Sequence, residues 1–236
     1  MAFQGNGPSG KFRVIGREAL LAPGFLVARL REQYGSPPPS PLLTPGGDPL
    51  ELLVLTLLSQ ATNDRNAALA YRRLRERFPS WEDVARVSPA EVAEAITPGG
   101  LRSLKAPRIQ GILHRLQAQQ GAYSLDFLRT FPSTKSFAYL TSFAGVGPKT
   151  AACVLLFAFG WPYFPVDIHI LRVTKRLGMI TCRETGEAQE VLAALFRPAD
   201  YLDLHLYLIQ HGRTVCRPRP RCKICFLQED CGQFLV

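Results

Sequence analysis

Two residues that can do chemistry stand at the two ends of one apolar segment. Lys149 follows the glycine-rich turn AGVGP, and Asp167 follows TAACVLLFAFGWPYFPV. If a helix begins at Pro148, the Lys149 amine lies in its first turn, where the positive helix dipole and partial burial should lower its pKa. An amine with a lowered pKa is a nucleophile that forms Schiff bases. The pattern indicates covalent catalysis, and an exposed lysine that binds phosphate is the alternative.

A carboxylate beside that amine would complete the site. A helix over 148–159 is about 18 Å long, and the helix-breaking segment GWPYFP can turn the chain back so that Asp167 returns to Lys149. Asp167 could then accept the lysine's proton and stabilise positive charge that develops on a sugar. The simpler role of Asp167 is to cap the helix that follows, and we expect it to do so.

Four of the six cysteines lie close together, at Cys216, Cys222, Cys225 and Cys231. Their spacing is C-x5-C-x2-C-x5-C. Zinc sites usually use two short cysteine pairs, and here only the middle gap is short. A [4Fe-4S] cluster takes four cysteine ligands, so the spacing favours this cluster over zinc. Its role can be that of a structural staple.

The other two cysteines and the histidines show no such pattern. Cys153 is expected in the core, because it lies in the apolar segment, and Cys182 is expected to be exposed. His114, His205 and His211 are interpreted as ordinary helix positions. His169 is interpreted as a packed helix residue, and an orientation toward the cleft beside Asp167 is the alternative.

The charge balance favours a polyanion as the partner. The chain of 236 residues has 28 Lys and Arg against 19 Asp and Glu, a net charge of +9. Basic side chains that neutralise phosphates release counterions, and the cysteine-rich stretch holds a group of them at Arg213, Arg217, Arg219, Arg221 and Lys223. No segment reaches the roughly 18 apolar residues of a membrane span. The sequence predicts a cytoplasmic protein without a membrane partner.

The elements that must position these residues are helices. Asp48 before Pro49 is typical of a helix start, and Ser88 with Glu91 forms a capping box. Apolar residues recur at helical spacing along the chain, and no segment of strand length alternates with period two. The sequence therefore predicts an all-α protein of about ten short helices, with a Pro-rich connector at 34–47.

The lysine belongs to a helix-hairpin-helix, expected over about residues 134–160. Glycines in the turn allow a close approach of the backbone, and the amides there can bind a DNA phosphate at the start of the second helix. The candidate contacts are Gly145, Val146, Gly147 and Thr150. A plain helix-turn-helix corner is the alternative.

These motifs together resemble endonuclease III, of the helix-hairpin-helix DNA glycosylase superfamily. The resemblance covers roughly residues 17–236 and is strongest in LLSQATND, FAGVGPKTAACVLLFAFGWP, VDIHILRV, HGRTVC and the terminal cysteines. It implies two all-α lobes with DNA across the cleft between them. A six-helix barrel would span 41–161, and an iron–sulfur cluster domain would combine 17–40 with 162–236. Residues 1–16 have no counterpart and are expected to form a flexible tail.

The resemblance also implies roles for single residues. Lys149 matches the nucleophile, Asp167 the catalytic aspartate, and the four clustered cysteines the ligands of the [4Fe-4S] cluster. Gln60 resembles the glutamine that fills the gap left by an extruded base, and Leu101 matches an apolar wedge beside it. A leucine on a Gly-Gly loop suits insertion between base steps. Further DNA contacts are expected from Arg217, Arg219 and Arg221.

The chemistry implied is base excision from double-stranded DNA with a damaged base. The nucleotide is flipped out, Lys149 attacks the sugar as the base departs, and β-elimination cuts the strand on the 3′ side. Substrates of the family are oxidised pyrimidines and abasic sites. A monomer is expected, in the cytoplasm, and with the nucleoid in a prokaryote.

The chain departs from the family pattern at several places. Pro148 takes the place of a common basic residue, which weakens the expected grip on phosphate. The first cysteine gap is x5 where the family usually has x6, and Gln60 comes one position early when counted from LLS. Two other functions stay open. One is a mismatch-type or other-lesion glycosylase of the same superfamily, and Lys149 argues against the monofunctional mismatch type. The other is a DNA-binding protein with little catalytic activity, against which Lys149 and Asp167 count.

Overall fold

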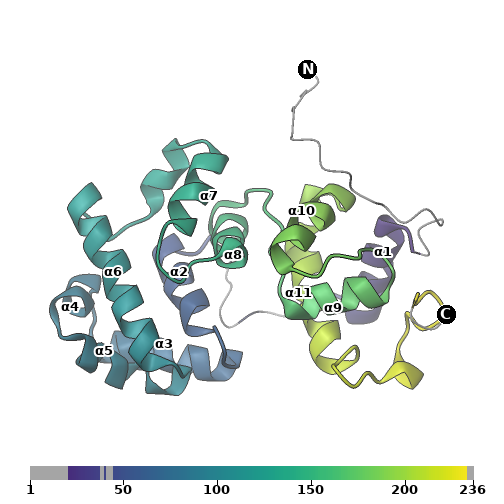
Figure 1. Cartoon of the computed structure of the whole chain (residues 1–236), viewed down its shortest axis with the longest axis horizontal. Helices are drawn as coiled ribbons and strands as arrows, with labels where there is room; N and C mark the ends of the chain where they lie inside the picture. Colours follow the sequence, from purple (N-terminus) through teal and green to yellow (C-terminus); the bar gives the residue numbers. More distant parts are fainter. Residues whose placement is uncertain (1–20, 38–39, 41–44, 233–236) are drawn as a thin grey trace.

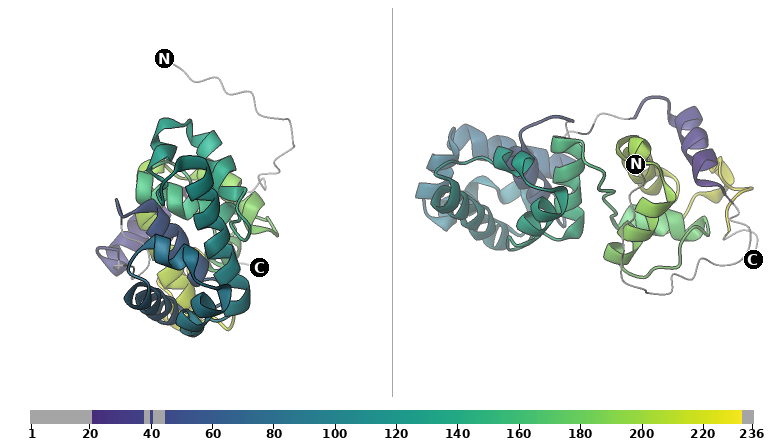
Figure 2. Two further views of the ribbon diagram at one scale, coloured as in Figure 1. Left: turned by 90° about the vertical axis from the view of Figure 1, so that its left-hand side faces the viewer. Right: turned by 90° about the horizontal axis from the view of Figure 1, so that it is seen from above.

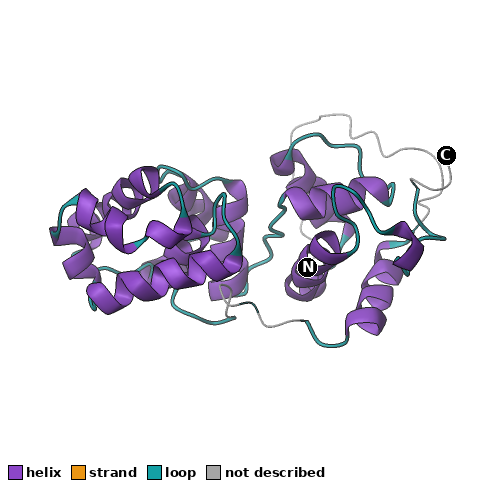
Figure 3. Ribbon diagram, turned by 90° about the horizontal axis from the view of Figure 1, so that it is seen from below, coloured by secondary structure: helices purple, strands orange, loops and turns teal. Residues whose placement is uncertain are grey.

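The structure, a computed structural model, describes residues 21–37, 40 and 45–232. Throughout this part of the chain every regular element is a helix and none is a strand (Figure 3). The predicted all-α class is therefore confirmed. The predicted flexible tail, 1–16, lies outside the described residues, as do 17–20 and 41–44 of the two predicted lobes.

The helices form two groups with one helix between them (Figures 1 and 2). The first group contains α2 (Pro49–Leu58), α3 (Asp64–Arg77), α4 (Trp81–Arg86), α5 (Pro89–Ala95), α6 (Arg102–Gln120) and α7 (Ser133–Thr141). The second contains α1 (Pro23–Tyr34), α9 (Ile168–Arg176), α10 (Thr185–Leu195), α11 (Tyr201–Thr214) and the C-terminal loop. Helix α8 (Pro148–Phe159) contacts helices of both groups.

The described part, 45–161, of the region expected to hold a six-helix barrel contains seven α-helical segments, counting α8. Two of them, α4 and α5, are short, and each begins at its own capping box, with Ser80 and Asp83 in one and Ser88 and Glu91 in the other. Because a capping box satisfies the free amides at a helix start, the chain makes two short helices here. The residue bounds of the two lobes stay a prediction.

Helix α8 is the central strut that the apolar segment predicts. Its side chains from Thr150 to Ala158 are all buried, so it shows no polar face. Cys153 lies fully inside, as predicted. Cys182, in contrast, was expected to be exposed and is only 6% exposed, because it packs into the core of the second group between α9 and α10. No described helix is long and apolar enough to cross a membrane.

Candidate active site

The ends of several helices surround a cleft of about 930 Å³ that contains both Lys149 and Asp167. Lys149 comes from the first turn of α8, and Asp167 directly precedes α9. The segment after α8 therefore turns the chain back, as the spacing of the two residues suggested. His205 and Arg213 on α11 and Gln60 after α2 line the same cleft.

Asp167 has a structural role that fixes its carboxylate in the cleft. Its Oδ1 accepts hydrogen bonds from the backbone amides of His169 at 2.8 Å and Ile170 at 2.9 Å. The predicted N-cap is thus present. Within the described residues no hydrogen bond or ion pair reaches Oδ2, and the carboxylate interacts electrostatically with the Lys149 ammonium. A carboxylate held by one oxygen keeps the other available for chemistry.

The electrostatics of Lys149 differ from the sequence-based expectation. Burial lowers the pKa of Lys149, but the sulfur of Cys153 and the carboxylates of Asp167 and Asp64 raise it, and the net direction is upward. The predicted lowering is therefore wrong for the free protein. The argument from the helix dipole omitted the opposite charges that only the folded chain brings near.

Cys153 lies one helical turn after Lys149 and accepts a hydrogen bond from its ammonium. Burial raises the pKa of the Cys153 thiol, so the thiol is neutral at ordinary pH and acts mainly as a hydrogen-bond acceptor. The charged groups that oppose deprotonation of Lys149 are then the two carboxylates. A bound DNA phosphate would oppose it further, and removal of the ammonium proton has to be part of any reaction.

His205 is a residue of this site that the sequence analysis missed. It is fully buried, and burial lowers its pKa to about 4. Its Nδ1 lies 2.9 Å from the carbonyl oxygen of Pro165, which makes Nδ1 the protonated nitrogen of the neutral ring. It lines the same cleft as Lys149 and Asp167 and interacts electrostatically with both. The interpretation of His205 as an ordinary helix position is therefore corrected, and no local motif could have shown this.

The helix-hairpin-helix is formed by α7, the turn 142–147 and α8. Gly145 has φ +83°, and a Cβ there would lie 2.7 Å from the side chain of Arg108. The positive φ favours glycine at this position, and the flexible side chain of Arg108 lies close against it. Gly147 is the exposed N-cap of α8, whereas Val146 is buried in the core and Thr150 is buried beside the cleft.

The predicted gap-filling residue, Gln60, and the predicted wedge, Leu101, lie on turns of unusual backbone geometry. Leu101 is 53% exposed, has φ +47° and precedes α6. The Gln60 side chain is not free, because its Nε2 donates to the carbonyl oxygen of Gly145 at 3.0 Å. The position one residue later, where counting from LLS places the family's glutamine, is Ala61, which is exposed and has φ +53°.

The basic residues of the C-terminal region divide into two sets. Arg217, Arg219 and Arg221 are exposed, as phosphate contacts require. Arg213 instead makes a bidentate ion pair with Asp64, at 2.6 and 3.0 Å, which joins α11 to α3. The grouping of Arg213 with the free basic side chains is therefore corrected.

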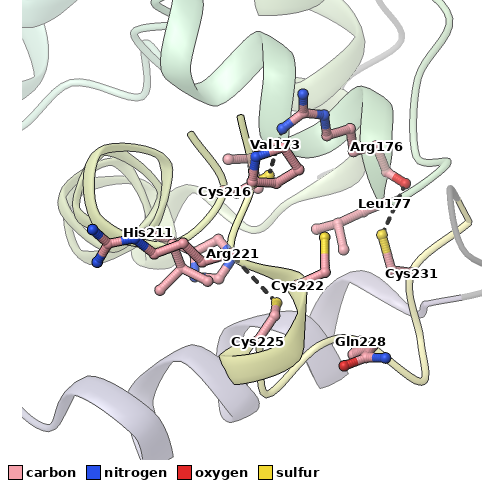
Figure 4. A pocket seen from close by; sticks show the side chains of 12 residues that line it. Val173, Arg176, Leu177, His211, Cys216, Arg221, Cys222, Cys225, Gln228 and Cys231 are labelled. Carbon is pink, nitrogen blue, oxygen red and sulfur yellow. Dashed lines mark hydrogen bonds between the residues drawn. The ribbon is translucent and has the colours of Figure 1, made fainter. Parts of the chain in front are cut away.

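The four clustered cysteines line one small cavity, of about 50 Å³, between the C-terminal loop, α9 and α11 (Figure 4). Cys216 Sγ accepts a hydrogen bond from Arg176, and Cys231 Sγ donates to the Arg176 carbonyl oxygen at 3.3 Å. His211, also interpreted above as ordinary, is buried with Nε2 3.8 Å from Cys225 Sγ. Burial raises the pKa of the Cys225 thiol, and electrostatic interaction with the other three cysteines raises it further.

The thiols that line this cavity are compatible with a thiolate-bound group. Among the described residues no three His, Cys, Asp or Glu side chains are placed to hold a single metal ion. Four thiols around one mostly apolar-walled cavity nevertheless match the four ligands of a [4Fe-4S] cluster. Val173, Leu177 and Val215 in the wall would keep water from such a group.

An all-α fold with a helix-hairpin-helix, a cleft lysine and a cleft aspartate defines the class of helix-hairpin-helix DNA repair glycosylases. Residues 54–198 match the HhH-GPD superfamily of base excision DNA repair proteins, and the chain belongs to this superfamily. The predicted enzyme class and the resemblance to endonuclease III are thereby confirmed.

Two relatives are similar to this chain over more than three quarters of its length. The endonuclease III of Thermotoga maritima is 32% identical over 185 residues, which cover 78% of this chain and 83% of that protein. A candidate DNA glycosylase of Arabidopsis thaliana is 36% identical over 190 residues, 77% of this chain. The match spans 64% of that plant protein, slightly less than two thirds of its length.

Solved structures agree with this placement. The chain is similar to endonuclease III in a non-covalent complex with DNA, with a TM-score of 0.76 and 26% identity over 90% of this chain and 94% of the other. It is equally similar to a trapped covalent intermediate of endonuclease III with DNA, at 89% and 93% coverage. The chain is therefore a base excision repair DNA glycosylase related to endonuclease III.

Proposed function

We propose that this protein is a bifunctional DNA glycosylase and abasic-site lyase that removes oxidised pyrimidines from double-stranded DNA. The observation that carries the proposal is the presence of Lys149 and Asp167 in one cleft. A glycosylase that only hydrolyses needs the carboxylate alone, whereas an amine beside it allows a covalent intermediate. The trapped covalent complex of the similar endonuclease III supports this course.

In the proposed reaction the nucleotide leaves the duplex and enters the cleft. The Lys149 amine attacks C1′, and the base departs with the electrons of the glycosidic bond and takes a proton. Opening of the sugar ring gives an iminium between Lys149 and C1′. Removal of a C2′ proton then expels the 3′ phosphate, which cuts the strand, and water releases the lysine.

The remaining groups of the cleft control protons and charge. Asp167 stabilises the positive charge that develops on the sugar and accepts a proton from the ammonium of Lys149. His205, neutral because burial lowers its pKa to about 4, adds no positive charge to this region. The hairpin residues Gly145 and Gly147 lie at the N-terminus of α8, which favours a phosphate there.

We also propose that Cys216, Cys222, Cys225 and Cys231 hold a [4Fe-4S] cluster. When bound, the cluster supplies covalent cross-linking of the C-terminal loop, which needs no change of oxidation state. The cross-link would fix Arg217, Arg219 and Arg221 for contacts with phosphates. The protein would act on DNA as a monomer in the cytoplasm.

The proposal is tested with a duplex that contains one thymine glycol and with borohydride, which reduces an iminium to a stable amine. We expect a covalent protein–DNA product with the wild type and none with Lys149→Gln. Lys135→Gln, an exposed lysine on α7, is the matched control and should form the product normally.

The absence of a trapped product from the wild type, with duplex binding intact, would overturn the lyase mechanism for this lesion. Product from an abasic duplex but not from thymine glycol would favour another lesion. Base release without any trapped product would favour the mismatch-type alternative, and binding with no reaction on any duplex would favour a protein that only recognises DNA.

A further inference from the structure

Lys105 is a buried cation that the reaction does not use. It lies in the first turn of α6 and is 1% exposed. Its Nζ donates three short hydrogen bonds to backbone carbonyl oxygens, those of Leu58 at 2.8 Å, Gln60 at 2.6 Å and Gly99 at 2.7 Å. The described part of the chain provides no carboxylate that forms an ion pair with it.

This placement opposes stability in two ways. A buried ammonium without a counter-ion loses its hydration, and the first turn of a helix lies at the positive end of the helix dipole. Burial accordingly lowers the pKa of Lys105 to about 8. The three carbonyl acceptors, however, match the three donors of the protonated amine. Such an arrangement holds two backbone segments, the end of α2 with its following turn and the turn at Gly99, around one point.

The segments that Lys105 joins are two turns, one with the predicted gap-filling residue Gln60 and one that leads to the predicted wedge Leu101. Gln60 directly precedes Ala61, and Gly99 lies two residues before Leu101. Ala61 and Leu101 are the non-glycine residues with positive φ in the described chain, at +53° and +47°. Left-handed backbone is uncommon outside glycine and persists where the surroundings over-determine it. Lys105 supplies a bond to each of these turns.

The packing around Gly99 reinforces the connection. A Cβ at Gly99 would lie 3.2 Å from the Ala70 side chain and 3.6 Å from the carbonyl oxygen of Leu58. The turn before Leu101 is therefore pressed against α3 and the end of α2. Beyond this turn the side chain of Leu101 extends into solvent.

We propose that Lys105 is a positioning residue that fixes the turn 59–62 and the loop 97–101 relative to each other, so that both enter the DNA duplex as one rigid wedge. The inference rests on the proposed function and adds how the protein opens a duplex. Insertion between base steps requires the inserted groups to keep their spacing against the restoring force of base stacking. A cation bonded to both turns provides that rigidity from within the core.

The test compares Lys105→Met, which keeps the length of the side chain without donors, with Gln110→Met. Gln110 is a matched control, because it is buried on the same helix and donates to the carbonyl oxygens of Val84 and Val87, away from both turns. Circular dichroism and thermal unfolding would establish that each variant is folded at the assay temperature.

Two substrates are used under single-turnover conditions with borohydride trapping: a duplex with one abasic site opposite adenine, and the same strand alone. Only the duplex requires a wedge, because the single strand already exposes the sugar. For Lys105→Met we expect the duplex-to-single-strand ratio of trapping rates to fall on the order of 10- to 100-fold below that of the wild type. For Gln110→Met we expect the wild-type ratio.

In folded Lys105→Met, an equal loss of both trapping rates would mean that the lysine only supports the fold. Two unchanged rates would mean that the lysine has no effect. Either result would overturn the proposal. A fall of the ratio in Gln110→Met as well would also overturn it. If the wild type forms no trapped product with either substrate, the proposed lyase function fails instead, so the two failures are distinguishable.

Discussion

The side-chain amide of Gln60 donates a hydrogen bond of 3.0 Å to the carbonyl oxygen of Gly145. The bond ties the turn after α2 to the loop of the helix-hairpin-helix, across 85 positions of sequence. Two parts of the candidate DNA surface are thus joined by this bond before DNA binds.

Gln60→Ala should weaken the binding of lesion-containing duplex. The loss of one hydrogen bond of this kind corresponds to about 1 kcal/mol, or roughly fivefold in Kd. The measurement is fluorescence anisotropy with a labelled duplex. Gln119→Ala, which removes an amide that accepts from Tyr139 at an exposed position, is the control; an equal effect of both substitutions would contradict a role of the Gln60–Gly145 bond.

Cys153→Ala should shift the alkaline dependence of borohydride trapping toward lower pH. Cys153 is a group that raises the pKa of Lys149 against the effect of burial, so its removal lowers that pKa and more free amine is present at a given pH. The pH profile of trapping on an abasic duplex measures the shift. Cys182→Ala, a buried cysteine of the second helix group, should leave the profile in place, and an unshifted profile for Cys153→Ala would rule out this effect.

His205 should make the folded state sensitive to acid. Its pKa is about 4 in the folded chain, against about 6.5 in the unfolded chain. Between these values the unfolded state binds more protons, so the free energy of unfolding falls as the pH is lowered. From pH 7.5 to pH 5 the loss due to His205 is about 2 kcal/mol.

Urea unfolding at the two pH values measures this loss. His205→Gln should show a smaller decrease than the wild type, by about the same 2 kcal/mol. His114→Gln, at an exposed position on α6, should decrease like the wild type. Equal decreases in all three proteins would show that His205 does not titrate in this way.

Cys225→Ser should abolish the incorporation of iron and acid-labile sulfide, because the cavity then lacks one of its four thiols. Elemental analysis and a sulfide assay of protein purified without air make the measurement, and Cys182→Ser is the control with full content. Zinc in the wild type instead of iron would contradict the proposed cluster and restore the alternative that the cysteine spacing left open.

The sequence by itself determined the local features of this protein. The caps at Asp48 and Asp167, the capping box of Ser88 and Glu91, and the helical hairpin are confirmed, because each depends on residues within one or two turns of one another. The HhH-GPD membership confirms the family to which these motifs point.

Only the tertiary structure decided the features that depend on long-range contacts, which are pKa shifts, burial and the pairing of distant side chains. It set the net direction of the Lys149 pKa through Cys153 on the same helix together with the carboxylates of Asp167 and Asp64 from elsewhere in the chain. It also brought His205 to the cleft from a position 56 residues beyond Lys149. It buried Cys182, paired Arg213 with Asp64, and joined Lys105 to two distant turns. Charge and burial act through space, and spacing along a chain does not specify the neighbours that folding supplies.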